Sequence, residues 1–173
     1  EQPALDRHRW DQGALVWLPF QLIASGDTGS ARLEGLVIRG ALASSLGSIH
    51  ATLAHVLWAD SIWLYRLAGW DKPGCAFPGT TGFADDWGDL CIRRRAFDDR
   101  LADWAASLDA AWLAGDLIWT SASAGGVRRT SRWSAVVHLF NHQTHHRGQV
   151  HAMLTAAGAR PDDTDLPLLP AGA

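Results

Sequence analysis

A chain of 173 residues that is 47% hydrophobic and 19% charged has the size and composition of one folded domain, which excludes a disordered protein. Its net charge of −3, with histidine counted as neutral, and its lack of a basic tail or stripe disfavour a nucleic-acid-binding protein. Because no stretch of about 18 consecutive apolar residues occurs, a membrane-spanning helix is not expected.

Cysteine usage favours a reducing compartment. Cys75 and Cys91 are the only cysteines, and they lack the C-x-x-C spacing of a zinc knuckle. The beginning of the chain also lacks the charged start and apolar middle of a signal peptide. We therefore expect a cytoplasmic protein without a disulfide framework.

The first half of the chain predicts two helices. The first runs from about residue 4 to residue 25, with a kink or early break near Pro19, and ends before a Gly-Asp-Thr-Gly stretch. Residues 30–43 have a mixed pattern and stay unassigned. The second helix covers residues 44–68, where leucine and isoleucine recur at three- and four-residue spacing, and Gly69 supplies its end.

The second half predicts two more helices. Residues 70–84 are rich in proline and glycine and should form a surface loop. The third helix covers residues 85–114, and its cationic run at 93–95, which lies among aspartates, is interpreted as the solvated face. Residues 117–120 and 127–130 surround a Gly-Gly pair and could form a short hairpin. The fourth helix begins after Ser131 as its N-cap and reaches about residue 157, before an extended tail.

Four helices without a substantial sheet predict an all-α fold. The simplest architecture is one four-helix bundle over residues 1–173, with the short hairpin between its third and fourth helices. Ten tryptophans are difficult to bury inside one small bundle, so we expect some of them to cover a subunit interface.

Histidine is concentrated in the fourth predicted helix, which holds five of the eight histidines. At about 100° per residue, positions four apart lie within roughly 40° of each other, so His142 and His146 share one face. Without a metal, these buried imidazoles would have to bond to backbone or water, whereas one ion accepts a lone pair from both. His138 and His145 lie toward one edge of that face, and each could replace one member of the pair. The spacing indicates a site for one divalent metal ion.

A third ligand has to come from another helix, because one helix offers little more than two well-aimed donors. His50 and His55 of the second predicted helix are the main candidates and His8 is a weaker one, and periodicity does not decide between them. Three neutral histidines leave an open position on the ion, which is typical of catalytic rather than structural sites. A zincin-type peptidase is not expected, because the sequence has no H-E-x-x-H motif.

Two stretches of the chain resemble the DinB family. They are G-S-I-H-A-T-L-A-H-V-L-W-A-D-S-I-W-L at 47–64 and H-L-F-N-H-Q-T-H-H-R-G-Q-V at 138–150, and the similarity extends to T-D-L-P at 164–167. The resemblance implies a four-helix bundle, often dimeric, with a metal held by three histidines. Carried over position by position, these are His55, His142 and His146, with His145 as a neighbour of the ligands.

The same motif suggests supporting residues. Asn141, Arg147 and Gln149 could make contacts behind the ligands, since a ligating imidazole usually donates its other N–H to a fixed acceptor. For Arg147, an ion pair between helices is the favoured alternative. Thr52 and Trp58 are close enough to His55 in the sequence to line a pocket. Asp60 falls on the leucine side of its helix, where a structural bond is favoured over a general-base role.

The resemblance implies a metal-dependent enzyme, such as a transferase that uses a low-molecular-weight thiol against an electrophilic substrate, or a hydrolase. The ion would be zinc, nickel or iron, since imidazole suits all three. The alternative is a non-catalytic metal-binding or stress-associated protein, and a protein-interaction module is a third idea. As partners we expect a second copy of the chain and small molecules, but neither nucleic acid nor membrane.

Overall fold

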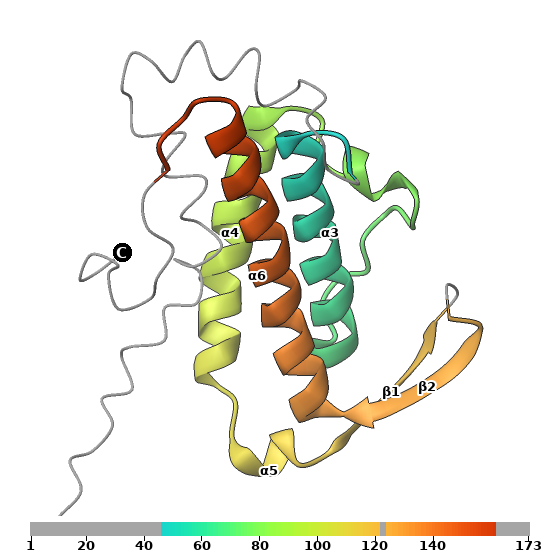
Figure 1. Cartoon of the computed structure of the whole chain (residues 1–173). Helices are drawn as coiled ribbons and strands as arrows, with labels where there is room; N and C mark the ends of the chain where they lie inside the picture. Colours follow the sequence, from blue (N-terminus) through green and yellow to red (C-terminus); the bar gives the residue numbers. More distant parts are fainter. Residues whose placement is uncertain (1–45, 122–123, 162–173) are drawn as a thin grey trace, which may run out of the picture.

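The structure is a computed structural model and describes residues 46–121 and 124–161. Its long helices are α3 (Ile49–Ala68), α4 (Trp87–Ala106) and α6 (Arg132–Ala156). The remaining elements are the 3-10 turn η1 (Gly79–Gly82), the short helix α5 (Ala110–Leu113) and the strands β1 (Asp116–Ser121) and β2 (Gly126–Ser131). Figure 1 shows the long helices side by side with their axes roughly aligned. The hairpin extends from the end of the helices where α6 begins.

The described part is mostly helical with one small two-stranded sheet. The predicted helix at 4–25, the unassigned segment at 30–43 and the end of the tail lie outside the described residues. A bundle of four long helices therefore stays a prediction. Within the described ranges, none of the helices combines the length and the apolar character needed to cross a membrane.

Capping residues set the ends of α3 and α6. The Ser48 hydroxyl accepts a hydrogen bond from the Ala51 N–H at 3.0 Å, so α3 begins at Ile49 rather than at the predicted residue 44. Gly69 ends α3 with a φ of 70°, a conformation that glycine adopts without strain. Ser131 caps α6 by accepting from the Ser134 N–H at 3.1 Å, as predicted.

The single third helix predicted at 85–114 is wrong in its length. It is divided into α4 and α5, because polar side chains between them bond to nearby backbone groups. Ser107 donates to the Trp104 carbonyl at 2.6 Å, and Asp109 accepts from the Trp112 N–H at 2.7 Å, which starts α5. A sequence pattern of apolar residues does not reveal this interruption.

The predicted hairpin is confirmed. β1 and β2 pair antiparallel, with Asp116 opposite Ser131 and Ser121 opposite Gly126. β2 leads directly into α6, where the Arg132 N–H donates to the Gly115 carbonyl at 2.9 Å. The hairpin is thereby attached to the beginning of the helix that carries most of the histidines.

The interpretation of residues 93–95 as a solvated face is wrong for Arg94, which is 0% exposed. Its guanidinium donates to Asp60 Oδ2 of α3 at 2.6 Å and to Asp98 Oδ1 of α4 at 2.9 Å. Gln143 of α6 donates to the same Asp60 oxygen at 2.9 Å. Burial raises the pKa of Asp60 to about 6, against the opposing effect of Arg94, so the carboxylate is ionised at neutral pH. One buried polar network thus joins α3, α4 and α6, and the expected structural bond of Asp60 is confirmed.

The described tryptophans pack mostly inside the chain. Only Trp133 is exposed, with an exposed fraction of 57%, among those in the described ranges. A cluster of Leu67, Leu117 and Ala135 is surrounded by four of the others, which are Trp63, Trp104, Trp112 and Trp119. These four indoles therefore have partners within one chain, and the homodimer stays a prediction.

Candidate metal centre

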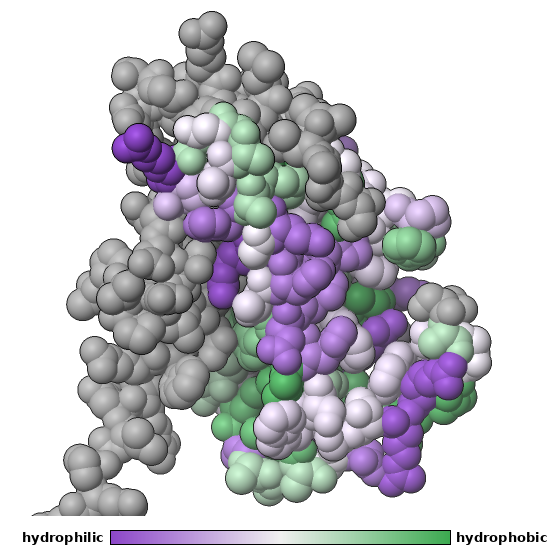
Figure 2. Space-filling view, in the orientation of Figure 1, coloured by the Kyte–Doolittle hydropathy of each residue, from purple (hydrophilic) through white to green (hydrophobic). Residues whose placement is uncertain are grey.

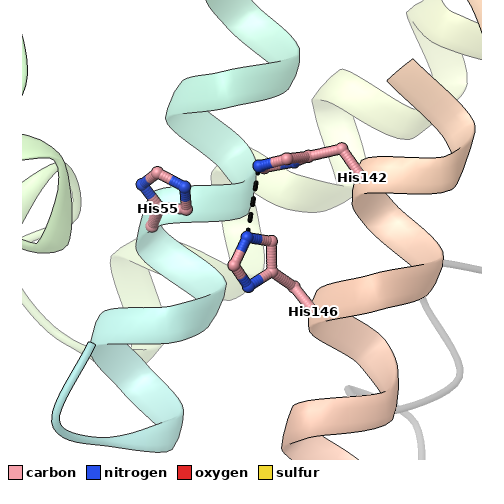
Figure 3. A group of neighbouring side chains, drawn as sticks. All are labelled: His55, His142 and His146. Carbon is pink, nitrogen blue, oxygen red and sulfur yellow. Dashed lines mark hydrogen bonds between the residues drawn. The ribbon is translucent and has the colours of Figure 1, made fainter. Parts of the chain in front are cut away.

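Three histidines from two helices meet between α3 and α6. Figure 3 shows His142 and His146 extending from α6 toward α3, which carries His55. One ring nitrogen of each lies within 4.8 Å of the others. The ring centroids are 5.4 Å apart for His55 and His142, 5.0 Å for His55 and His146, and 4.4 Å for His142 and His146. Of the histidines considered as ligands, these three are the ones that the described structure brings together.

Neutral neighbours orient two of the rings. The Nδ1 of His146 lies 2.8 Å from Gln149 Oε1, and because that oxygen only accepts, Nδ1 donates and Nε2 keeps its lone pair. The Nδ1 of His55 lies 2.8 Å from Thr80 Oγ1, so donation to this hydroxyl leaves the Nε2 of His55 as the ligand atom. The predicted contact of Gln149 with a candidate ligand is confirmed, and its part in metal binding stays a prediction.

Thr80 was not found from the sequence. It lies in η1, within the predicted surface loop at 70–84, yet it is 0% exposed and contacts a histidine 25 positions earlier. No spacing rule connects a threonine in such a loop with a helix in this way. The Pro/Gly-rich composition indicated a loop but not that part of it would be buried against α3.

The arrangement fits a divalent ion. In a tetrahedral site with metal–nitrogen distances of about 2.0–2.1 Å, two ligand nitrogens are roughly 3.4 Å apart. The Nε2 atoms of His142 and His146 are 3.2 Å apart. The Nδ1 of His142 is buried with no hydrogen-bond partner, so only the Nε2 side of this ring is engaged. Two neutral imidazoles facing each other at this spacing are already positioned as ligands, and the ligand nitrogen of His55 lies within 4.8 Å of theirs.

All three rings are held in the neutral form that binds metals. Burial, and then the neighbouring His146, His55, His138 and His145, lower the pKa of His142 to about 3. Burial also lowers the pKa of His55, with a further contribution from His146. For His146, burial lowers the pKa more than the bond to Gln149 raises it. At neutral pH each ring therefore offers a lone pair without first losing a proton.

The remaining candidates lie outside the triad. His138 is exposed with its ring against Trp63 at 4.9 Å, and His145 is exposed beside His146. His50 is half-buried and does not join the group, and His8 lies outside the described residues.

The other predicted supporting residues are placed as follows. Asn141 is exposed, and Arg147 is half-buried. Thr52 is buried and donates to the Ser48 carbonyl, away from the triad. The ring of Trp58 stacks on that of His55, with centroids 6.1 Å apart and planes at 27°. Trp58 thus has a ring contact with the triad.

Without metal, the protein should lose stability through the triad as the pH falls below about 6.5. The folded-state pKa of His142, about 3, lies below the 6.5 expected when unfolded, so the unfolded chain binds more protons in between. This contribution is complete above pH 6.5 and is lost as the pH falls toward 3, and His55 and His146 have the same sign. Urea denaturation of chelator-treated protein from about pH 7 to pH 4 measures it.

Asp60 has the opposite effect on the free energy of unfolding, which it raises as the pH falls. Its raised pKa lets the folded state take up a proton between about pH 6 and 3.8. A matched variant, His142→Gln, separates the two contributions by removing only a histidine. The free energy of unfolding should fall more for the parent than for this variant over the same pH range. Equal slopes for the two proteins would show that the pKa of His142 is not lowered in the folded protein.

Comparison with known proteins identifies the family of the chain. No curated protein matches the chain. The family model described as the DinB family matches residues 40–173, which include α3, α6 and all three histidines. The match covers well over half of the sequence, and the chain belongs to the DinB family.

Proposed function

We propose that His55, His142 and His146 bind one divalent metal ion, and that the chain is a metal-dependent enzyme acting on a small molecule. The observation that carries this proposal is the set of three neutral imidazoles whose ligand atoms lie within 4.8 Å of one another. Zinc, nickel and iron all suit such donors. A three-histidine set leaves a coordination position open, which favours a catalytic role over a structural one.

The reaction that this site supports best is transfer of a low-molecular-weight thiol to an electrophile. When bound, a divalent ion with an open position lowers the pKa of a thiol or water held there. The protein's own part is to hold the imidazoles neutral by burial and to orient two of them through Thr80 and Gln149. Trp58 covers one side of His55 with an apolar ring. No carboxylate of the described residues contacts the triad, so general-base catalysis by an acidic side chain is not part of the proposal.

The first experiment is elemental analysis of the untagged protein and of the double variant His142→Ala, His146→Ala. About one ion per chain in the parent and almost none in the variant is expected. Protein that contains no ion and takes up none from zinc, nickel or iron would end the proposal.

Activity is tested next with the metal-loaded protein, a cysteine-based thiol and 1-chloro-2,4-dinitrobenzene. In this reaction the thiol sulfur displaces chloride and the thiol proton goes to the buffer. A rate above that of the double variant supports the enzyme. Bound metal without turnover of any electrophile or hydrolysable ester would instead identify a non-catalytic metal-binding protein.

Removing the bond behind His146 should weaken metal binding without removing a ligand. In Gln149→Leu the Nδ1–H of His146 loses its acceptor, and we expect metal affinity to fall by about 10- to 100-fold. Competition with a chromogenic chelator measures the affinity. Asn141→Leu, at an exposed position of the same helix, is the control and should bind metal like the parent. An unchanged affinity in Gln149→Leu would remove this residue from the site.

Two further features are part of the proposal. We propose a cytoplasmic protein, for which the support is a sequence with only two cysteines and no pattern of a disulfide framework. We also propose a homodimer, for which the support is the exposed Trp133 at the first turn of α6. Light scattering after gel filtration tests the dimer, and a monomeric mass at micromolar concentration would exclude it.

A further inference from the structure

A pocket of about 880 Å³ opens beside α3, outside the histidine triad. Its walls come from the face of α3 between Trp58 and Arg66, from the loop at residues 72–77, and from the β1 residues 118–120. None of the three triad histidines lines it. Its volume is within the range of about 300–1,000 Å³ that is typical of small-molecule sites.

The charged side chains in the wall of this pocket are both cations. They are Arg66 of α3 and Lys72 of the loop, and no aspartate or glutamate lines the pocket. The guanidinium of Arg66 lies over the ring of Trp63 at 4.8 Å and over that of Trp119 at 5.6 Å. No carboxylate of the described residues forms an ion pair with it. Burial lowers the pKa of Arg66, which is the effect of a cation that has left water without an anionic partner.

The remaining wall is mostly apolar and open to solvent. Tyr65, Phe77 and Ile118 are 41%, 67% and 62% exposed, and all three line the pocket. Trp58 forms a fixed part of the wall, because its indole N–H donates to the Cys75 carbonyl at 2.8 Å. Figure 2 shows strongly hydrophilic and hydrophobic residues next to each other on the hairpin side of the molecule. Large apolar side chains exposed around a half-buried cation are typical of a binding site rather than of ordinary surface.

We propose that this pocket binds a small organic carboxylate with a flat apolar body. The carboxylate would bond to Arg66, whose planar guanidinium matches its two oxygens, with Lys72 at the rim. The apolar body would lie against Trp58, Trp119 and Phe77. Arg66 is half-buried while Lys72 is exposed at the rim, so the single desolvated cation matches one negative charge better than a phosphomonoester, which carries about −1.5 to −2 at neutral pH.

The pocket and the metal centre share a side chain. Trp58 lines the pocket and stacks on His55, three positions earlier on the same helix face. The apolar body of the bound molecule would therefore lie against a ring that contacts His55, and we assign this molecule to the substrate of the proposed enzyme. That assignment rests on the proposed function, whereas binding of the carboxylate needs no metal and can be tested separately.

The test uses 2-naphthoate and its neutral analogue 2-naphthamide as probes, with full-length, chelator-treated protein in a calorimeter. Both molecules have the same apolar body, so their difference isolates the negative charge. We expect one 2-naphthoate per chain and binding of 2-naphthamide that is about 10- to 100-fold weaker. In Arg66→Gln the two probes should bind almost equally, and in Lys72→Gln the preference for 2-naphthoate should decrease by a smaller factor.

Arg100→Gln is the matched control, because Arg100 also lies over a tryptophan, Trp70, at 4.1 Å, but does not line the pocket. It should keep the full preference for 2-naphthoate. Lys72 is exposed in the loop, so its substitution leaves the fold intact even if Arg66→Gln is unstable.

The proposal is overturned if 2-naphthoate does not bind at about 1 mM or binds no better than 2-naphthamide. It is also overturned if Arg66→Gln folds and keeps the preference, or if Lys72→Gln and Arg100→Gln have equal effects. Because the measurement is made without metal, absence of a metal site would end the proposed enzyme but leave this result unchanged.

Discussion

Replacing His142 with alanine should lower the affinity of the protein for zinc by roughly 100- to 1,000-fold, while the helices remain folded. Zinc sites with four protein ligands contribute about 10–16 kcal/mol, so a single ligand is worth about 2.5–4 kcal/mol. His142 has its Nε2 3.2 Å from that of His146, and its ring lies 5.4 Å from that of His55. Its removal therefore leaves only one nitrogen from each helix.

Competition with a chromogenic chelator at neutral pH measures this loss. Thermal unfolding gives a second readout, because an ion that binds only the folded state raises the melting temperature of the parent more than that of the variant. Circular dichroism without metal shows whether the helices are intact. Removing a half-buried imidazole whose Nδ1 has no partner should change helix content little.

His145→Ala is the matched control for this prediction. His145 is adjacent to His146 in the chain and belongs to the same motif, but its side chain is exposed and outside the group of three. The control should bind zinc within a factor of about 3 of the parent, which is the usual context dependence of a surface change. Equal losses in the two variants would mean that histidine content on α6, rather than the arrangement of the triad, determines metal binding.

Helical spacing was sufficient to predict the α6 half of the site. A four-residue separation places His142 and His146 on one face whatever the helix packs against, so local geometry alone brings them together. The third ligand is different, because the choice between His50 and His55 depends on which face of α3 meets α6. Only the resemblance to the DinB family selected His55, and the structure agrees by leaving His50 outside the group.

What the sequence did not predict depends on partners far apart in the chain. Thr80 contacts His55 across 25 positions, Arg94 contacts Asp60 across 34, and Gln143 contacts Asp60 across 83. A cation among aspartates on a helix has the same local pattern whether it is solvated or buried. The composition of residues 93–95 therefore could not show that Arg94 faces the core. By contrast, helix ends that depend on nearby caps, such as Gly69 and Ser131, were predicted correctly.

The same buried network gives the largest expected effect on stability. Arg94→Met should lower the free energy of unfolding by about 3–5 kcal/mol, because two buried carboxylates lose their shared cation. Asp60 is 0% exposed and Asp98 is 7% exposed, so water cannot replace the guanidinium. For a domain of this size, such a loss lowers the melting temperature by roughly 6–20 °C. Urea denaturation at neutral pH, with and without metal, measures the change.

Acid should partly rescue this variant. Burial already raises the pKa of Asp60 to about 6 in the presence of Arg94, and removal of the cation raises it further. At pH 5 the Asp60 carboxyl group of the variant can be protonated, which removes one unpaired charge, so the difference from the parent should be smaller than at pH 7. A difference that is the same at both pH values would attribute the loss to packing alone.

Arg93→Met is the matched control, since Arg93 is the preceding residue and its ion pair with Asp89 is about one-third exposed on both sides. It should cost less than about 1 kcal/mol. If both variants lose the same stability, the network is not what holds α3 and α4 together.

If only Arg94→Met is destabilised, its metal affinity shows whether the network also supports the triad. Gln143 donates to Asp60 and directly follows His142 in α6. Loosening this network should therefore also loosen His142.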